Sequence, residues 1–175
     1  MSSDFYPYEK FENSPNYDNR GFFQRIYCRQ QVSEASPLKQ INHSFTRRRG
    51  TIRGLHYQVS PFQETKFVKI LSGEIFDVIV NINRNDPMWG TIKTAKMSWS
   101  DDYIIKIPEG YAHGFQTISD NVSIIYMHDA VHSPDHERGY RYDSPQLDIN
   151  WPLDVTFISN RDLMLPAFSY ELQDL

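Results

Sequence analysis

The fold is decided by one run of nine residues, Gly50-Thr51-Ile52-Arg53-Gly54-Leu55-His56-Tyr57-Gln58. Side chains alternate between the two faces of a β-strand, so a strand over residues 51–58 places His56 on the same face as Ile52 and Gly54. A face of this kind, apolar with one imidazole, can point into the interior of a barrel. His56 alone does not decide its own role, because a half-buried histidine with one hydrogen bond is common.

The spacing around His56 resembles the first motif of the small metal-binding barrels called cupins. Gly50 and His56 match the glycine and the first histidine of that motif, but Gln58 stands where the second histidine belongs. An amide is a poor ligand for the metals of such sites, and no carboxylate follows closely. The run Ile107–Gly114 supplies the Pro-x-Gly-x-x-His pattern of the second cupin motif. Together the two runs predict the barrel without its metal, and a histidine that acts as a metal-free catalyst.

Length, charge and cysteine content limit the class of protein. A chain of 175 residues is long enough for one domain with its own core. The net charge of −4 argues against a general nucleic-acid binder. Cys28 is the single cysteine, which excludes an internal disulfide and fits a reducing compartment. No stretch has the character of a signal peptide or a membrane span, so we expect a cytoplasmic protein without a membrane partner.

The spacing of apolar runs and turn-forming residues along the chain is typical of an all-β protein. Short runs rich in β-branched and aromatic residues recur roughly every ten residues with Gly, Asn, Asp or Pro between them, which predicts a sandwich or barrel. Besides residues 51–58, the predicted strands are Lys66–Leu71, Glu74–Ile82, Thr91–Met97, Tyr103–Ile107 and Val122–His128. There is no long helical periodicity, and short helices are expected at most over Gln30–Glu34 and Phe168–Leu172.

Several motifs follow one another in a fixed order. They are Arg53–Gln58, Lys66–Lys69, Gly73–Val78, Ile107–Phe115, Tyr126, His136–Gly139 and Asp148–Pro152. This ordered set resembles the dTDP-4-dehydrorhamnose 3,5-epimerase family, and the likeness extends from Arg20-Gly21-Phe22-Phe23 to Arg161-Asp162. The resemblance is specific because several multi-residue motifs match at compatible spacings.

The resemblance implies a fold, an assembly and an activity. The fold would be an all-β, cupin-like jelly-roll barrel with short peripheral helices, built as one domain over residues 1–175. The assembly would be a homodimer that exchanges an N-terminal arm, around Ser2–Pro15, between subunits. The activity would be that of an isomerase that inverts C3, C5 or both in a nucleotide-linked 4-keto-6-deoxy sugar. Its expected substrate is dTDP-4-dehydro-6-deoxy-D-glucose, its product dTDP-4-dehydro-L-rhamnose, and neither a metal nor an organic cofactor is expected.

Four residues match the catalytic positions of the family. His56 resembles the base, and a neutral imidazole is suited to accept a carbon-bound proton at about pH 7. Asp162 resembles the aspartate that holds one nitrogen of that ring protonated. Tyr126 resembles the proton donor on the opposite side of the sugar, and Lys66 the lysine that stabilises the enolate oxygen. Inversion requires groups on two faces, because one base that removes and returns a proton on one face restores the starting centre.

Five residues match positions that bind the nucleotide diphosphate. Arg53 and Arg20 are the candidates for the phosphates, since a guanidinium can grip two phosphate oxygens at once. By the resemblance, Arg20 comes from the exchanged segment of the other subunit. Phe23, Gln40 and Asn42 match the nucleotide end, where a ring stacks on the base and amides recognise its edge.

Two further residues match positions in the sugar pocket. They are His113, in the Pro-x-Gly-x-x-His run, and Asp77, in the motif Gly73–Val78. An equally good interpretation of Asp77 is that it satisfies hydrogen bonds inside the barrel. The competing interpretations are an exposed strand lysine for Lys66 and an ordinary core aromatic for Phe23.

At the nucleotide end the chain departs from the usual residues of the family. Met127 follows Tyr126 where a lysine is usual, Val131-His132 stands in place of an aromatic pair, and Gln40-Ile41-Asn42 replaces Gln-Asp-Asn. A lost stacking ring costs on the order of 1–2 kcal/mol of base binding. The nucleotide base is therefore left open.

Three other functions stay open on the sequence. A single-centre epimerase acting at C3 or C5 alone would use the same His, Asp and Tyr. A metal-dependent cupin predicts bound iron, manganese or zinc, and Gln58 argues against it. A silent sugar-nucleotide-binding barrel has no need of His56, Asp162 and Tyr126 together, so their joint presence favours the enzyme.

Overall fold

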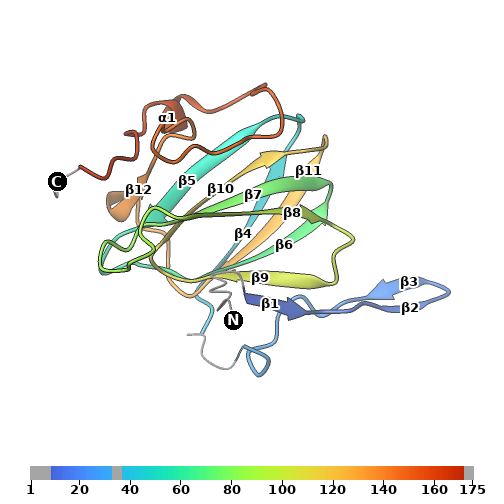
Figure 1. Cartoon of the computed structure of the whole chain (residues 1–175). Coiled ribbons are helices and arrows are strands. Elements are labelled where there is room, and N and C mark those ends of the chain that lie inside the picture. Colours follow the sequence, from blue (N-terminus) through green and yellow to red (C-terminus); the bar gives the residue numbers. More distant parts are fainter. Residues whose placement is uncertain (1–8, 33–36, 172–175) are drawn as a thin grey trace, which may run out of the picture.

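The computed structural model describes residues 9–32 and 37–171, and two five-stranded sheets face each other in it (Figure 1). The first sheet contains, in spatial order, β1 (Glu9–Glu12), β9 (Tyr103–Ile107), β6 (Lys66–Ser72), β11 (Val122–His128) and β4 (Gln40–Thr46). The second sheet contains β12 (Glu137–Gly139), β5 (Ile52–Gln58), β10 (Tyr111–Thr117), β7 (Glu74–Asn81) and β8 (Ile92–Ser98). Most neighbours are not consecutive in the chain, because it crosses repeatedly between the sheets, as in a jelly roll. The predicted all-β, cupin-like jelly-roll fold is confirmed.

The predicted strands are all present. Their observed bounds differ from the predicted ones by at most one residue at either end. The agreement follows from the short β-branched and aromatic runs and the turn residues between them, which are local properties of the sequence. Two long strands that were not predicted, β4 and β10, complete the two sheets.

The main hydrophobic core lies between the sheets. Its buried members are Val68, Ile70, Ile75, Ile79, Met97, Ile105, Ile107, Phe115, Val122 and Ile124. Burial of each such side chain contributes about 1.5–3 kcal/mol, so this layer holds the two sheets together. Tyr126 packs against the same layer from the inward face of β11. The polar site therefore continues the interior of the barrel at the place where the apolar core ends.

Both sheets are also covered on the outside. On the second sheet, Leu147 and Phe168 from the C-terminal third of the chain pack against Leu55 and Val78. This segment runs across the β5 and β12 side of the barrel (Figure 1). On the first sheet, residues including Val32 cover an apolar patch formed by strands β6, β9 and β11. The cover brings the C-terminal segment, and α1 with it, next to β5.

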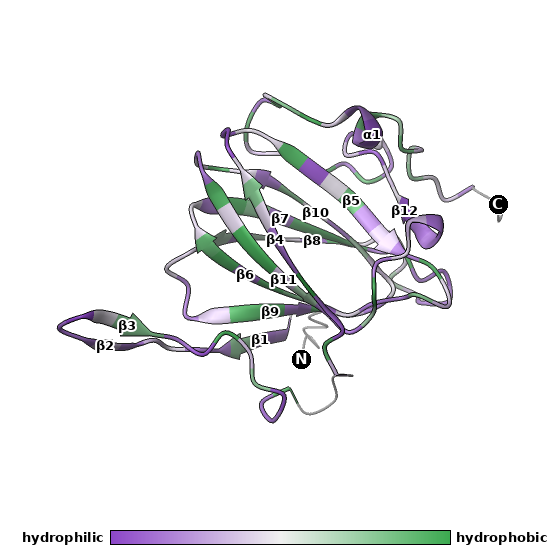
Figure 2. Cartoon of the chain, turned by 180° about the vertical axis from the view of Figure 1, so that it is seen from behind, coloured by the Kyte–Doolittle hydropathy of each residue, from purple (hydrophilic) through white to green (hydrophobic). Residues whose placement is uncertain are grey.

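A two-stranded hairpin extends away from both sheets (Figures 1 and 2). It consists of β2 (Asn16–Asp18) and β3 (Gly21–Phe23). Its aromatic side chains are largely exposed, with 74% exposure for Tyr17 and 73% for Phe23. An isolated two-stranded hairpin is marginally stable in water, and clustered exposed aromatics are typical of a contact surface.

The predicted arm, Ser2–Pro15, is described in part. Strand β1 (Glu9–Glu12) pairs with β9 of its own chain at the edge of the first sheet. Residues 2–8 lie outside the described residues. Exchange of the arm between subunits stays a prediction.

The two predicted helix positions are wrong over the described residues. Residues 30–32 of the predicted helix Gln30–Glu34 form a turn, and residues 33 and 34 are not described. In the predicted helix Phe168–Leu172, the described part has no helical turn of its own. Phe168 is instead buried in the cover of the second sheet, where its backbone N–H donates to the Ser144 hydroxyl. Tertiary packing has overridden a weak local preference.

The short helices lie elsewhere. They are the 3₁₀ turn η1 (Pro134–His136) and α1 (Asn160–Leu163). Ser159 caps α1, because its hydroxyl accepts a hydrogen bond from the Asp162 backbone N–H at 3.0 Å. Nowhere in residues 9–32 and 37–171 does a helix have the length and apolar character needed to cross a bilayer.

Candidate active site

An open pocket of about 570 Å³ lies between the two sheets. We call its sides the first-sheet wall, formed by β4, β6 and β11, and the second-sheet wall, formed by β5 and β10 with α1 beside them. Eight of the eleven predicted site residues line it, namely Gln40, Asn42, Arg53, His56, Lys66, His113, Tyr126 and Asp162.

The second-sheet wall carries a hydrogen-bonded histidine and aspartate. His56 Nε2 lies 2.8 Å from Asp162 Oδ1. Burial raises the pKa of the Asp162 carboxyl, but its bonds to His56 and to the Gly54 N–H outweigh burial, and the pKa lies below its ordinary value. An ionised carboxylate only accepts, so Nε2 carries the proton and Nδ1 is the ring nitrogen left to accept another. The side chain of His56 is 28% exposed, which leaves it within reach of a ligand.

A bulge in β5 brings Arg53 into the same pocket. His113 of β10 pairs with His56, but Phe115, two residues on, pairs with Arg53, three residues back. The extra residue on β5 turns the Arg53 side chain to the face that also carries His56. Gly54 lies in the bulge with a φ of +118°, and a Cβ there would come 2.5 Å from Gly114 Cα. This position therefore requires glycine.

His113 and Asp77 form a buried pair beside the pocket. His113 Nε2 lies 2.7 Å from Asp77 Oδ1, and the two side chains are 5% and 0% exposed. Asp77 does not line the pocket and stands behind His113. Of the two interpretations of Asp77, the contact to His113 favours a residue that orients a pocket side chain.

Tyr126 stands on the wall opposite His56. Its ring centroid lies 6.0 Å from that of His113. Burial raises the pKa of the Tyr126 phenol well above its ordinary value, and the negative charge of Asp77 raises it further. The phenol is therefore a protonated group that can donate.

Lys66 is not an exposed strand lysine. Its side chain is 10% exposed, and Nζ lies 3.1 Å from Glu64 Oε1. Nζ also donates to the backbone carbonyl of His56 at 3.2 Å. The ammonium is thus held between the two walls of the pocket.

The amides predicted for the nucleotide end lie side by side on β4. Gln40 Nε2 donates to Asn42 Oδ1 at 3.1 Å. Gln40 Oε1 accepts from the His132 backbone N–H at 2.8 Å. Each amide is held in one orientation by these contacts.

Two predicted residues lie away from the pocket of their own chain. Arg20 is in the turn of the hairpin, where it pairs with Asp18 at 2.6 Å, and its side chain is 90% exposed. Phe23 is on β3 and exposed, so it is not an ordinary core aromatic. A single chain does not bring them to the site.

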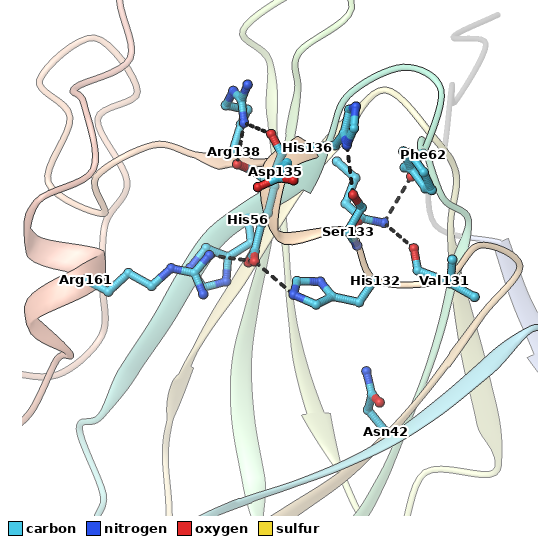
Figure 3. Close-up of polar contacts among 12 residues, drawn as sticks. Asn42, His56, Phe62, Val131, His132, Ser133, Asp135, His136, Arg138 and Arg161 are labelled. Atoms are coloured by element: carbon cyan, nitrogen blue, oxygen red, sulfur yellow. Dashed lines mark hydrogen bonds and ion pairs between the residues drawn. The ribbon is translucent and has the colours of Figure 1, made fainter.

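Gln58, at the second ligand position of the metal motif, makes hydrogen bonds to the backbone of Phe62, Val131 and Ser133, which are labelled in Figure 3. Its amide nitrogen donates to the carbonyls of Phe62 and Val131, at 3.0 and 3.3 Å. Its amide oxygen accepts from the Ser133 backbone N–H at 2.6 Å. Gln58 thus ties together two loops at the pocket rim.

Residues 9–170 match the family model described as dTDP-4-dehydrorhamnose 3,5-epimerase. The chain belongs to the dTDP-4-dehydrorhamnose 3,5-epimerase family. The predicted family and the isomerase class are confirmed. An epimerase of this family from Pseudomonas aeruginosa is 37% identical over 157 residues, which cover 87% of this chain and 86% of that one.

Solved structures of the family superpose closely on this epimerase. One is the Bacillus anthracis dTDP-4-dehydrorhamnose 3,5-epimerase with TDP and pyrophosphate bound, with a TM-score of 0.89, 30% identity and coverage of 96% of this chain and 98% of that one. Another is the Legionella pneumophila dTDP-6-deoxy-D-glucose-3,5-epimerase in complex with dTDP-4-keto-L-rhamnose, with a TM-score of 0.84, 29% identity and 97% coverage of both chains.

The pocket of the epimerase also contains acidic, basic and histidine side chains that the sequence motifs did not assign to a site. They are Glu64, His128, His132, Glu137 and Arg161. Arg161 and His132 approach the Glu137 carboxylate from two sides, at 2.6 and 3.5 Å (Figure 3). His128 could have been found, because it lies two residues after Tyr126 and alternation puts both on one face. Glu64 carries no such signal, since it precedes its strand.

Proposed function

We propose that the epimerase converts dTDP-4-dehydro-6-deoxy-D-glucose to dTDP-4-dehydro-L-rhamnose by inverting C3 and C5. The observation that carries the proposal is the placement of the His56–Asp162 pair and the Tyr126 phenol on opposite walls of one pocket. The ligands of the two solved relatives support a thymidine diphosphate sugar as the substrate.

The residues divide the chemistry between the two walls. His56 Nδ1 takes the proton from the carbon beside the ketone, and the electron pair of that C–H bond moves into the enolate. The Lys66 ammonium stabilises the negative charge on the enolate oxygen. Tyr126 then gives a proton to the same carbon from the other face, so the configuration inverts. Asp162 stabilises the imidazolium that His56 becomes.

The nucleotide diphosphate is proposed to lie toward β4. Arg53 is suited to the phosphates, because its guanidinium is partly exposed at the pocket while its Nε–H donates to the Thr46 hydroxyl at 3.0 Å. Gln40 and Asn42 offer amides toward the base. Arg20 and Phe23 complete this end only if a second chain supplies them.

A homodimer is proposed for that reason. The hairpin carries Arg20 and Phe23 away from the pocket of their own chain, and its exposed aromatics are suited to a contact with another subunit. A two-fold dimer would place each hairpin at the partner's pocket.

We also propose a cytoplasmic location. Cys28, the single cysteine, is a free thiol. Disulfides are typical of oxidising compartments, so a chain without one fits the cytoplasm. Fractionation of the native cells would test this placement.

The test of the activity is proton NMR in heavy water with dTDP-4-keto-6-deoxyglucose. We expect the C3 and C5 hydrogen signals to fade as solvent deuterium replaces them. Loss of one signal alone would show a single-centre epimerase, and retention of both would overturn the proposal. In H56N we expect exchange to slow by about 10²- to 10⁴-fold. Calorimetric titration with TDP should show that this variant still binds the nucleotide.

The test of the shared site is subunit complementation. H56N lacks the base and R20A lacks the hairpin arginine, so each homodimer should be impaired. In a mixed dimer one site joins an intact His56 to an intact Arg20 from the other chain, and random mixing restores roughly a quarter of wild-type activity. No recovery on mixing would place Arg20 outside the partner's site.

A further inference from the structure

A continuous chain of hydrogen bonds runs along the first-sheet wall, and it begins at the nucleotide end. The His132 backbone N–H donates to Gln40 Oε1 at 2.8 Å. Gln40 Nε2 donates in turn to Asn42 Oδ1 at 3.1 Å. The backbone group fixes the orientation of the first amide, and the first amide fixes that of the second. The Asn42 amide nitrogen is thereby turned toward His128.

The chain continues to the catalytic end through two residues that the proposed mechanism does not use. Asn42 Nδ2 lies 3.4 Å from His128 Nε2. His128 Nδ1 lies 2.8 Å from Glu64 Oε2. The other oxygen of that carboxylate, Oε1, lies 3.1 Å from the Lys66 ammonium, which also donates to the carbonyl of His56. Seven side-chain and backbone groups are thus linked end to end.

Strand register places the links in one row. His128 of β11 pairs with Gln40 of β4 on one side and with Lys66 of β6 on the other. The side chains of His128, Glu64 and Lys66 are each only 10% exposed. Burial of charged and polar groups costs free energy unless they are paired, so the mutual pairing of these three side chains stabilises the arrangement.

The donor and acceptor roles along the chain are determined. Burial raises the pKa of the Glu64 carboxyl, but the hydrogen bond from His128 and the charge of Lys66 outweigh burial and bring the pKa to about 2. Glu64 is therefore an anion that only accepts, and His128 Nδ1 must carry a proton. With Nδ1 protonated, Nε2 is the ring nitrogen left to accept from the Asn42 amide, 3.4 Å away. Among the described residues, each amide keeps one further N–H for a ligand.

We propose that Glu64 and His128 are positioning residues that join the catalytic end of the pocket to its nucleotide end. Glu64 holds the Lys66 ammonium where the enolate oxygen forms. His128, kept as the Nδ1–H tautomer by Glu64, holds the amides of Asn42 and Gln40. The inference rests on the function proposed above, and it adds two residues to the machinery of that reaction.

The residues at the two ends of this chain of hydrogen bonds act on different parts of the substrate. A lysine side chain is flexible, so without Glu64 its ammonium would sample other positions and stabilise the enolate less. The free N–H groups of Gln40 and Asn42 require acceptors on the ligand, such as carbonyl or phosphoryl oxygens. Loss of the two halves of the chain should therefore affect different kinetic constants.

The first test is E64Q, which keeps the size of the side chain and removes its charge. We expect kcat to fall about 10- to 100-fold with KM changed less than about threefold.

The matched control is E74Q. Glu74 also pairs with a lysine, Lys96, at 2.9 Å, but on the surface and away from the pocket. This control should leave kcat and KM as in the wild type. Wild-type kcat in E64Q, or a rise in KM as large as the fall in kcat, would overturn the role of Glu64.

The second test separates the two nitrogens of His128. In H128N the amide nitrogen stands in for Nδ1 and keeps the bond to Glu64, so we expect KM to rise about fivefold with kcat little changed. In H128Q the longer side chain stands in for Nε2 and keeps the contact to Asn42, so we expect kcat to fall. Equal effects of both variants on kcat and KM would overturn the role of His128 as a link.

The third test is the tautomer of His128, read from the nitrogen shifts in a ¹⁵N-edited NMR spectrum and assigned by comparison with H128N. The singly protonated Nδ1–H form is expected in the wild type, and either the Nε2–H form or a doubly protonated ring would overturn the hydrogen-bond chain. This measurement needs no substrate. If wild-type protein fails to exchange C3 or C5 hydrogens, the proposed function fails, and the tautomer still decides whether the chain of bonds exists.

Discussion

On the first-sheet wall, β11 keeps one regular register with β4 and β6 from Ile124 to His128, whereas on the second-sheet wall β5 and β10 shift by one residue between His113 and Phe115. The regular wall presents its side chains in rows, so that His128 stands between Gln40 and Lys66. The shifted wall presents Arg53 and His56 on one face although they are three residues apart. In a regular strand only every second side chain lies on one face. A bulge is needed to bring two residues that are three positions apart onto the same face.

The walls differ as well in what holds their polar groups. The first-sheet wall satisfies its own side chains along the wall, through the contacts of Glu64 and His128. On the second-sheet wall, Asp162, which is hydrogen-bonded to His56, comes from α1. The C-terminal segment that covers the second sheet brings α1 next to β5. Substitution of a polar side chain on the first-sheet wall should therefore disturb only its neighbours on that wall. On the second-sheet wall it should also disturb the packing of the C-terminal segment.

The largest expected effect that separates the walls is that of Y126F. The variant keeps the base on the opposite wall, so solvent exchange at the carbon beside the ketone should continue. Product formation should fall by about 10²- to 10⁴-fold, because the proton donor on the other face is lost. Y111F is a matched control, since Tyr111 is also partly buried against the core but does not line the pocket. Equal loss of exchange and product in Y126F would place both steps on one residue.

The next largest effect is expected for G54A, at the bulge. A Cβ there would meet Gly114 Cα at 2.5 Å and would require a side chain at a φ of +118°. We expect the free energy of unfolding to fall by on the order of 2–3 kcal/mol. Activity should fall too, because Arg53 and His56 would no longer share a face. G110A is the control, since Gly110 has a φ of +83° but its Cβ would have only an ordinary contact at 3.6 Å. Chemical denaturation that gives both variants the same stability would show that the close approach of β5 and β10 is unimportant.

The free energy of unfolding should depend on pH through the Glu64 carboxylate on the first-sheet wall. Its folded pKa of about 2 lies below the ordinary value of 4.5, so the stabilisation is complete above about pH 4.5 and is lost as pH falls toward 2. The difference in stability between wild type and E64Q should therefore shrink over this window. Urea unfolding at a series of pH values measures it. A difference that is constant with pH would show that the Glu64 carboxylate is not specially stabilised in the fold.

The smallest effect is expected for S159A, which removes the cap of α1. The hydroxyl accepts from the Asp162 backbone N–H, and loss of such a cap costs about 1 kcal/mol. Because α1 supplies the acid of the second-sheet wall, kcat should fall moderately, and by less than in D162N. Thermal unfolding and steady-state kinetics measure the two effects. Unchanged kcat with lowered stability would show that strand contacts alone position Asp162.

Much of the fold could be predicted from the sequence, because it depends on local patterns. The β-branched and aromatic runs in residues 66–71 and 122–128 indicate strands wherever they pack. The run ending in His56-Tyr57-Gln58 indicated the barrel and the missing metal ligand. It did not reveal that Gln58 joins two loops, because both partner loops are distant in the chain. The helix predictions failed at Phe168, where burial against the second sheet outweighs local preference.

For the site, the motifs named the residues, and eight of them line one pocket. They did not reveal how the residues are held. Alternation alone places Arg53 on the face opposite His56, and the bulge reverses that. Arg20 and Phe23 lie on the exposed hairpin, away from the pocket of their own chain, so their roles stay predictions.

By itself the sequence determined most of the long strands, the family and the candidate catalytic residues, because each is written in short runs of neighbouring residues. Only the tertiary structure decided which groups touch. The His56–Asp162 bond joins residues 106 positions apart, and the Glu64–His128 bond joins residues 64 positions apart. Contacts over such separations depend on the register between strands and on the packing of the C-terminal cover, and neither is a local property of the chain.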